Sequence, residues 1–342
     1  MKRVFSSLAI VALGLSTLTA CDPPMPPDVQ AQIAEQTFTC VAGDASVAFP
    51  ALMSDLSEGF SASLSSACTD PVMSLSNSDA AASMIVISPY KEACSAYESV
   101  PFALEAADIY VYFADGYSIS LSPKTIAGIF DGSITDWSDK AIAKDNPDLV
   151  LPNEPIVLTK SADALAVSAM QDWLKSFGVS FAPDLQDSQS DELPAFVEGQ
   201  IGIVKHSVVT YNSLSPVGII VGSNKDGQII ATADNAGIGS AATQQQVTKS
   251  SGRVDVSVNH SQAPLVMSGF DSASTPYGAI YPVMLNLCGE NSLVARAVAR
   301  FLLRLDSQGS LGASNYNPLS EAVRAEALVE VSKGLKLPKV SK

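Results

Sequence analysis

Six short apolar runs recur along the chain, and each is rich in β-branched or aromatic residues. They cover residues 83–87, 108–113, 155–159, 201–204, 217–221 and 280–287. Runs of this length and composition predict buried strands. Between several of them the apolar residues recur at the spacing of a helix, and this alternation predicts an α/β fold with parallel sheets.

Three predicted helices have a start signal as well as an apolar face. Ser122 and Pro123 supply an N-cap and a proline at the first helical position, and Gly132 follows the segment. Asp163 can cap a second helix, and a third begins near Ser292. The three apolar faces consist of Ile126, Ile129 and Phe130; of Ala166, Met170, Trp173, Leu174 and Phe177; and of Val294, Val298, Phe301, Leu302 and Leu305.

The sequence offers few candidates for catalysis or cofactor binding. The two histidines, His206 and His260, have neither the spacing of zinc ligands nor that of a catalytic triad. Residues 237–242 fit the dinucleotide pattern G-x-G-x-x-A, but they follow a polar segment, so we interpret them as a loop. We therefore expect a protein that is not an enzyme and that binds no cofactor and no metal.

The first residues have the pattern of a secretory signal. A basic start at Lys2 and Arg3 precedes an apolar stretch that ends in Leu18-Thr19-Ala20-Cys21. This ending resembles a bacterial lipobox, in which the cysteine becomes the first residue and is acylated; an ordinary cleavage site is the alternative. The segment 22–28 contains four prolines and predicts a semi-rigid stalk. We expect a signal peptide over 1–20, a lipidated Cys21 with a tether over 21–36, and anchoring on the extracytoplasmic face of a membrane.

Composition and charge limit the possible partners. The chain is 47% hydrophobic and only 16% charged, which is typical of a globular protein. Acidic residues outnumber basic ones by 35 to 20, and the formal net charge is −15. Because nucleic-acid binding depends on a basic surface, we expect no nucleic-acid partner.

Four cysteines remain after Cys21: Cys40, Cys68, Cys94 and Cys288. An even number in an oxidising compartment favours two disulfides over a metal site, since no C-x-x-C spacing occurs. Three pairings are possible. We favour Cys40 with Cys68, which brackets one strand–helix–strand step, and Cys94 with Cys288, which ties the C-terminal region back to the N-terminal one.

Several motifs follow one another in a specific order from Pro101 onward. Ile129-Phe130, Gly132, Ile134 and Trp137 come first, followed by the pairs 146–147, 151–152 and 155–156. The strand 199–207 and the C-terminal NYNPL segment complete the series. In this order the motifs resemble those of the periplasmic phosphate-binding proteins of phosphate ABC transporters, over nearly the whole chain from about Thr37.

The resemblance implies a two-lobe α/β fold of the type II periplasmic-binding-protein kind, with two hinge crossings and a central ligand cleft. The crossings would fall near 100–112 and 262–282. The first lobe would comprise 37–105 and 275–342, and the second 106–274. In such a fold, helix N-termini from both lobes can surround an anion without net positive charge on the protein.

The resemblance also implies the function. Such a protein captures inorganic phosphate, or a related small anion, as a monomer and delivers it to an ABC transporter permease. The alternative is a divergent relative that has lost phosphate binding, and that binds another ligand or serves as a cell-envelope interaction protein.

The loops that hold phosphate in the family are altered in this chain. Ser46, beside Ala45, offers a hydroxyl in place of the family threonine, and Ser88 begins a second loop that lacks the family aspartate. Lys160 replaces the arginine of the third loop, Ser161 matches its first serine, and Asp163 follows them. By resemblance, these six residues lie nearest the ligand. Asp163 would either repel the anion or, like Asp44, accept the proton of a protonated phosphate.

Overall fold

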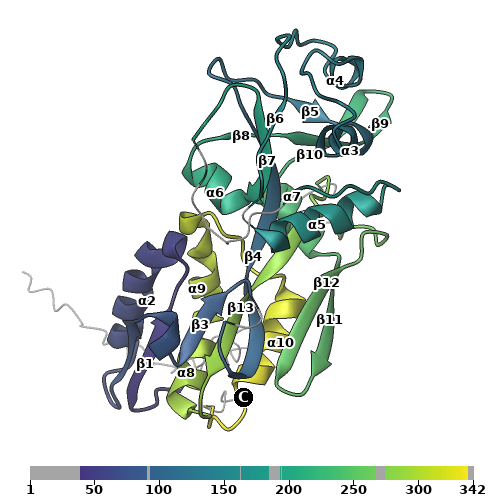
Figure 1. Cartoon of the computed structure of the whole chain (residues 1–342). Helices are drawn as coiled ribbons and strands as arrows, with labels where there is room; N and C mark the ends of the chain where they lie inside the picture. The colour runs from purple at the N-terminus through teal and green to yellow at the C-terminus, as the bar shows by residue number, and fades with distance from the viewer. Residues whose placement is uncertain are drawn as a thin grey trace, which may run out of the picture.

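The computed structural model describes residues 39–90, 93–161, 163–184, 193, 195–265 and 274–337. The predicted signal peptide, Cys21 and the tether lie outside these residues. Two lobes are stacked one above the other, and the long strand β4 (Ala96–Tyr112) passes from the lower into the upper one (Figure 1). The expected two-lobe α/β fold is therefore confirmed.

The lower lobe is built on a mixed sheet. Its strand order is β11-β12-β4-β13-β3-β1-β2. The strands other than β4 are β1 (Gly43–Ala48), β2 (Met73–Asn77), β3 (Ile85–Ser88), β11 (Gln245–Ser250), β12 (Arg253–Val258) and β13 (Ile280–Cys288). Strand β1 runs parallel to β2 and β3, as predicted, whereas β13 runs antiparallel to β3 and β4. The expectation of parallel sheets is therefore only partly met. Strand β4 leads out of the lower lobe and β13 leads back into it, so these two strands are antiparallel.

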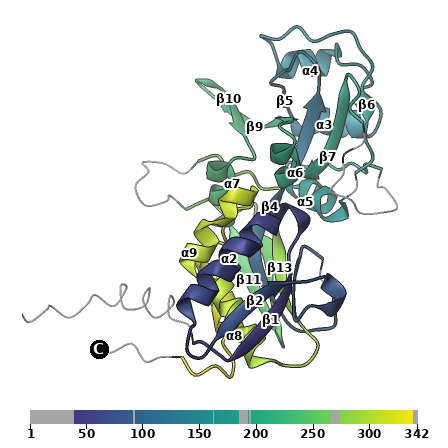
Figure 2. The same cartoon turned by 90° about the vertical axis from the view of Figure 1, so that its left-hand side faces the viewer.

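Helices from both ends of the chain cover the lower sheet (Figure 2). They are α2 (Ser54–Ala67), α8 (Leu293–Leu302), α9 (Leu305–Gly309) and α10 (Glu321–Val331), with the short turns η1 (Ala51–Met53), η2 (Ala80–Ala82) and η3 (Leu311–Ser314). The predicted cap of α8 is confirmed, since Ser292 Oγ accepts a hydrogen bond from the Ala295 N–H at 3.3 Å. Leu305 lies beyond the end of α8 and is largely exposed.

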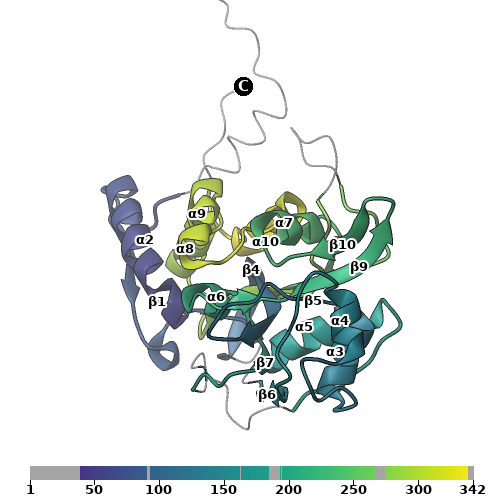
Figure 3. The same cartoon turned by 90° about the horizontal axis from the view of Figure 1, so that it is seen from above.

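The upper lobe surrounds the second half of β4. Its strands are β5 (Ser120–Leu121), β6 (Val157–Leu158), β7 (Gln200–Lys205), β8 (Ser215–Pro216), β9 (Gly218–Asn224) and β10 (Gly227–Ala231). Its helices are α3 (Pro123–Phe130), α4 (Lys140–Asp145), α5 (Ala164–Lys175), α6 (His206–Tyr211) and α7 (Asn235–Ala242). Seen from above, α3 and α4 lie on the opposite side of β4 from α8 and α9 (Figure 3).

The predicted starts of α3 and α5 are also confirmed. Ser122 Oγ accepts from the Thr125 N–H, and Asp163 caps α5. The segment 237–242 was expected to be a loop, but it lies in α7. The polar segment before it supplies the N-cap, because Asp234 Oδ1 accepts from the Gly237 N–H at 2.7 Å. The preceding β10 forms an antiparallel hairpin with β9, so the glycines do not follow a strand of a parallel βαβ unit.

Strand β4 belongs to both lobes. Its first part pairs with β13, and residues 107–112 pair with β7. Its residues from Glu98 to Val111 are buried, which explains why this run shows no polar alternation. The lobe boundaries at 105 and 274 remain predictions. The hairpin β11–β12 falls within 106–274, yet it joins the lower sheet through the pair Arg253 and Ser99.

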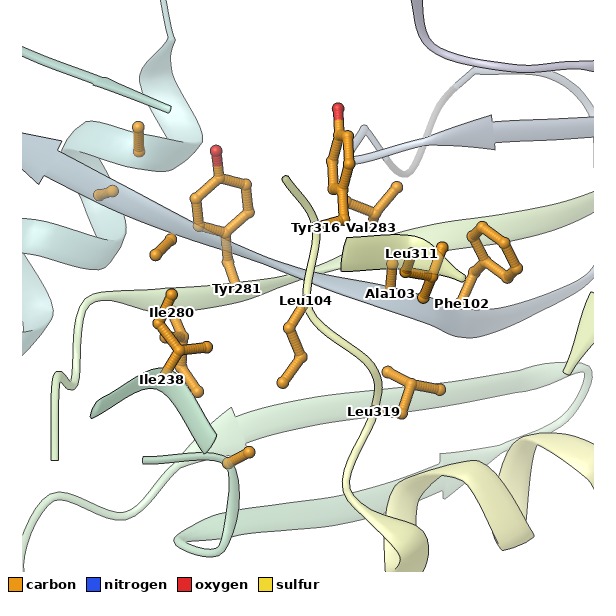
Figure 4. Close-up of a cluster of buried hydrophobic side chains, with 14 of the residues drawn as sticks. Phe102, Ala103, Leu104, Ile238, Ile280, Tyr281, Val283, Leu311, Tyr316 and Leu319 are labelled. Atoms are coloured by element: carbon orange, nitrogen blue, oxygen red, sulfur yellow. The ribbon is translucent and has the colours of Figure 1, made fainter. Parts of the chain in front are cut away.

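Buried hydrophobic side chains surround the crossing strands β4 and β13. Figure 4 shows Tyr281 and Tyr316 pointing to one side of β4 and β13, while Leu104 and Leu319 point to the other. Apolar side chains, among them Val283 and Leu311, also lie on the side of the two tyrosines, so the paired strands are covered by hydrophobic residues on both sides.

Both favoured disulfides are present. Cys40 bonds to Cys68, and Cys94 bonds to Cys288 at the end of β13. In the described part of the chain, no helix has the length and apolar character needed to cross a membrane.

Candidate functional site

The N-terminus of α5 is occupied by a buried carboxylate of the chain itself. Asp163 is 4% exposed, and its Oδ1 accepts hydrogen bonds from the N–H groups of Leu165 at 2.9 Å and Ala166 at 3.1 Å. A negative charge is stabilised here because the first N–H groups of a helix have no partner within the helix. The helix end at which an anion could bind is therefore already in contact with an acidic side chain.

Three further groups converge on this carboxylate from different parts of the fold. The Tyr90 hydroxyl, just after β3, donates to Oδ1 at 3.3 Å, and the Tyr281 hydroxyl of β13 donates to Oδ2 at 3.2 Å. Lys205 Nζ, at the end of β7, lies 3.7 Å from Oδ2. We call Asp163, Tyr90, Tyr281 and Lys205 the Asp163 cluster. It joins the lower lobe, a crossing strand and the upper lobe at one point.

Burial holds the Tyr281 hydroxyl in its protonated form. The pKa of Tyr281 lies well above its usual value, first because the side chain is buried and then because the Asp163 charge is close. Tyr281 therefore remains a hydrogen-bond donor across the physiological pH range.

The structure places Ser88 and Ser161 beside the cluster. Ser88 Oγ accepts from the Tyr90 N–H at 3.1 Å, and Ser161 Oγ accepts from the Asp163 N–H at 3.3 Å. Both hydroxyls thus hold the loops that carry cluster residues. Lys160 begins the same loop as Ser161, and its side chain is exposed.

Ser46 and Ala45 are not brought to this place. Ala45 is fully buried inside β1, and Ser46 Oγ accepts from the Met84 N–H at 3.0 Å. Ser88 lies four residues further along the adjacent strand, which corresponds to about 13 Å. Asp44 is further still, since its carboxylate accepts from the hydroxyls of Ser74 and Ser76 at the start of the strands. Of the two carboxylates considered as proton acceptors, only Asp163 lies between the lobes.

The segment Lys205-His206-Ser207 was not among the expected site residues. Each of its members contacts a different buried carboxylate. Lys205 contacts Asp163, and His206 Nδ1 lies 3.1 Å from Asp108 Oδ2. Ser207 donates to Glu105 twice, from Oγ to Oε2 at 2.5 Å and from its N–H to Oε1 at 3.2 Å. The sequence did contain a signal for this segment: three acids, Glu105 and Asp108 among them, lie within the apolar run that forms β4, and a polar triplet directly follows a predicted strand.

The pKa values of Glu105, Asp108 and His206 all depart from those of exposed side chains. Burial raises the pKa of Glu105 to about 7, although the hydrogen bonds from Ser207 oppose the shift. Burial also raises the pKa of Asp108. Burial alone would lower the pKa of His206, but the hydrogen bond and charge of Asp108 outweigh it, so that this pKa is raised.

Two cavities lie along α5 on the side of β12 and β13. One of about 320 Å³ is lined by Leu165, Ser168 and Tyr281 among others, and one of about 610 Å³ is lined by Asp172, Trp173 and His260 among others. Among the described residues, no group of three or more histidine, cysteine or acidic side chains could hold a metal ion.

No protein-family model matches this chain. Solved structures do match its fold. A high-affinity periplasmic phosphate-binding protein solved with phosphate is 12% identical, with a TM-score of 0.51 over 87% of this chain and 100% of that one. A human phosphate-binding apolipoprotein is 14% identical, with a TM-score of 0.51 over 84% of this chain and 94% of that one. A DING protein is 13% identical, with the same score and coverage as the apolipoprotein. The resemblance inferred from the motifs is therefore confirmed for the fold: the chain has the two-lobe architecture of the periplasmic phosphate-binding proteins.

Proposed function

We propose that this protein is an extracytoplasmic solute-binding protein that captures inorganic phosphate, or a related small anion, between its two lobes. The Asp163 cluster is the observation that carries the proposal. An ammonium group and two tyrosine hydroxyls meet at one point between the lobes, beside the N-terminus of α5 that Asp163 caps. These are the groups that bind oxyanions in proteins. The role is binding and delivery rather than catalysis.

The carboxylate of Asp163 selects for an anion that carries a proton. Hydrogen phosphate has an O–H group that can donate to Asp163 in place of a tyrosine hydroxyl, and its other oxygens can then accept from Lys205 and from the tyrosine hydroxyl that is released. Sulfate has no proton near neutral pH, so it would meet the same carboxylate with like-charge repulsion. Asp163 thus takes the proton-accepting role of the aspartate that is missing from the loop at Ser88.

The N-terminal sequence and the disulfides support an extracytoplasmic, lipid-anchored location. Cys21 would carry the lipid that anchors the protein to the membrane, and the proline-rich segment after it would act as the tether. The two disulfides support an oxidising, extracytoplasmic compartment. From there, the bound anion would pass to the permease of an ABC importer.

Isothermal titration tests the proposal directly. The chain from residue 29 to 342, dialysed free of phosphate, is titrated with phosphate and with sulfate. We expect phosphate to bind with a Kd of about 1 μM or lower and sulfate to bind at least about tenfold more weakly. An absence of heat or thermal shift with any anion up to about 1 mM contradicts phosphate capture and favours the alternative, a scaffold used for other contacts.

A pair of lysine variants tests the site. Lys205→Ala removes the ammonium group next to Asp163 and should weaken phosphate binding at least about tenfold. Lys160→Ala removes the exposed lysine of the neighbouring loop and should change affinity by less than about twofold. The reverse order would assign the anion contact to Lys160.

A further inference from the structure

Three carboxylates and the Lys205-His206-Ser207 segment form one buried group at the first crossing between the lobes. Glu105, Asp108 and Asp163 are 2%, 0% and 4% exposed, and each is held by a different residue of the segment. Lys205 contributes an ammonium group, which contacts Asp163. With His206 neutral, three ionised carboxylates would share one positive charge. Such an excess of buried negative charge is unfavourable, and it is relieved when a proton binds.

Other charged and titratable groups also face this buried group. They are Asp234, at the start of α7, and the tyrosines Tyr277, Tyr281 and Tyr316. Burial raises the pKa of Tyr277 and that of Tyr281 well above the usual value, so both keep their protons, and Asp234 adds further negative charge. Among the described groups that shift the pKa of Glu105, His206 is the basic one, and the groups that shift the pKa of His206 are all acidic.

This buried group is in contact with the proposed anion site through two routes. Lys205 contacts Asp163 and directly precedes His206. Tyr281 donates to Asp163 and pairs with Glu105 in the register of β13 and β4. Directly opposite residues of an antiparallel pair have their side chains on the same face, so Glu105 and Tyr281 are neighbours. Negative charge added beside Asp163 therefore acts on Glu105 and His206 through Lys205 and Tyr281.

We propose that anion capture between the lobes is coupled to the uptake of a proton by Glu105 and His206. This inference rests on the proposed function. The incoming anion adds negative charge beside Asp163 and competes with it for Lys205. A proton taken from water by the Glu105 carboxylate, or by Nε2 of His206, compensates for this charge. Nε2 faces the hydroxyl of Thr210 at 3.3 Å on the exposed side of α6, which gives water access to it.

Thermodynamic linkage then fixes the direction of the pH effect. If binding takes up protons, the affinity for the anion must rise as the pH falls. Two substitutions should change the affinity for the anion in opposite directions. Glu105→Gln keeps an oxygen to accept from the Ala106 and Ser207 N–H groups and imitates the protonated acid. His206→Asn keeps a donor toward Asp108 but cannot become charged.

The experiment is calorimetry with inorganic phosphate in two buffers of different ionisation heat, which counts the protons taken up per anion. Near pH 7, we expect Glu105→Gln to take up about half a proton less than the wild type. Near pH 8 it should bind about tenfold more tightly than the wild type, and near pH 6 equally well. His206→Asn should bind more weakly near pH 6 and equally near pH 8. The titration of phosphate itself is common to all variants and cancels in the comparison.

Asp145→Asn is the matched control. Asp145 is also a largely buried carboxylate of the upper lobe, and it accepts from the Ser122 N–H and the Thr125 hydroxyl, away from the crossing. It should leave the proton uptake unchanged. If the wild type binds phosphate and all three variants take up the same number of protons as it does, the coupling is overturned and the proposed function stands. If the wild type binds no anion, both are overturned.

Discussion

The two oxygens of Asp163 serve different partners. Oδ1 caps α5, whereas Oδ2 faces the Tyr281 hydroxyl and the Lys205 ammonium group. Capping does not require a charge, since an asparagine side chain accepts from helix N–H groups as well as an aspartate does. Selection for a protonated anion does require it. The two roles can therefore be separated by one substitution.

Asp163→Asn should remove the selectivity and keep the fold. We expect the ratio of phosphate to sulfate affinity to fall by about tenfold or more, because the like-charge repulsion of sulfate is lost. Titration calorimetry with both anions measures the ratio. Urea unfolding measures the free energy of unfolding, which should be unchanged if asparagine caps α5 as aspartate does. A variant that keeps the wild-type ratio would show that Asp163 does not face the ligand.

Glu105 gives the free energy of unfolding a definite dependence on pH. Its pKa is about 7 in the folded protein against 4.5 for an ordinary glutamate, so the folded state binds more protons between these values. Stability is therefore lost as the pH rises from about 4.5 to about 7. The raised pKa of His206 acts in the same direction, through a loss that begins above about 6.5.

Glu105→Gln should consequently stabilise the protein at alkaline pH. The difference between the two pKa values corresponds to about 3 kcal/mol, which is the upper limit of the gain at pH 8. Near pH 4.5 the gain should vanish. Urea unfolding of both proteins across this pH range measures it, and a constant difference between them would contradict the assignment to Glu105.

At the scale of helices and strands, the sequence predicted features that depend on neighbouring residues better than contacts between residues far apart in the chain. Ser122, Asp163 and Ser292 were identified as caps because a cap depends on residues within one turn. Helix α7 was missed because its glycine-rich sequence has low helix propensity, which tertiary packing of Ile238 and Ala241 overrides. The Asp163 cluster could not be predicted in full, because Tyr281 lies 118 residues away in sequence and reaches Asp163 only through the crossing strands.

The packing of the second crossing against α5 can be tested with one methyl group. A Cβ on Gly278 would overlap the indole of Trp173 and lie 2.9 Å from Nδ1 of His260. Gly278→Ala should therefore destabilise the protein by about 1–3 kcal/mol. Gly59→Ala is the matched control, because a Cβ there meets nothing within 4 Å in α2 and should stabilise by about 0.5–1 kcal/mol. Thermal unfolding measures both, and a neutral Gly278→Ala would show that the crossing shifts freely relative to α5.

For the whole molecule, the two disulfides constrain the unfolded chain to different extents. Cys40–Cys68 closes a loop with a sequence separation of 28, whereas Cys94–Cys288 closes one of 194 that includes the entire upper lobe. The entropy that a cross-link removes from the unfolded state grows with the logarithm of loop length. The longer link should thus contribute about 2 kcal/mol more to stability.

Replacing each cystine by a pair of serines measures this difference. We expect urea unfolding of the Cys94→Ser, Cys288→Ser double variant to show the larger loss of stability, because its unfolded chain regains the freedom of the longer loop. The Cys40→Ser, Cys68→Ser variant is the control for the loss of a cystine as such. Equal losses would mean that the unfolded chain already keeps the ends of the long loop together. A larger loss at Cys40–Cys68 would show that this link stabilises the folded lower lobe more than it restricts the unfolded chain.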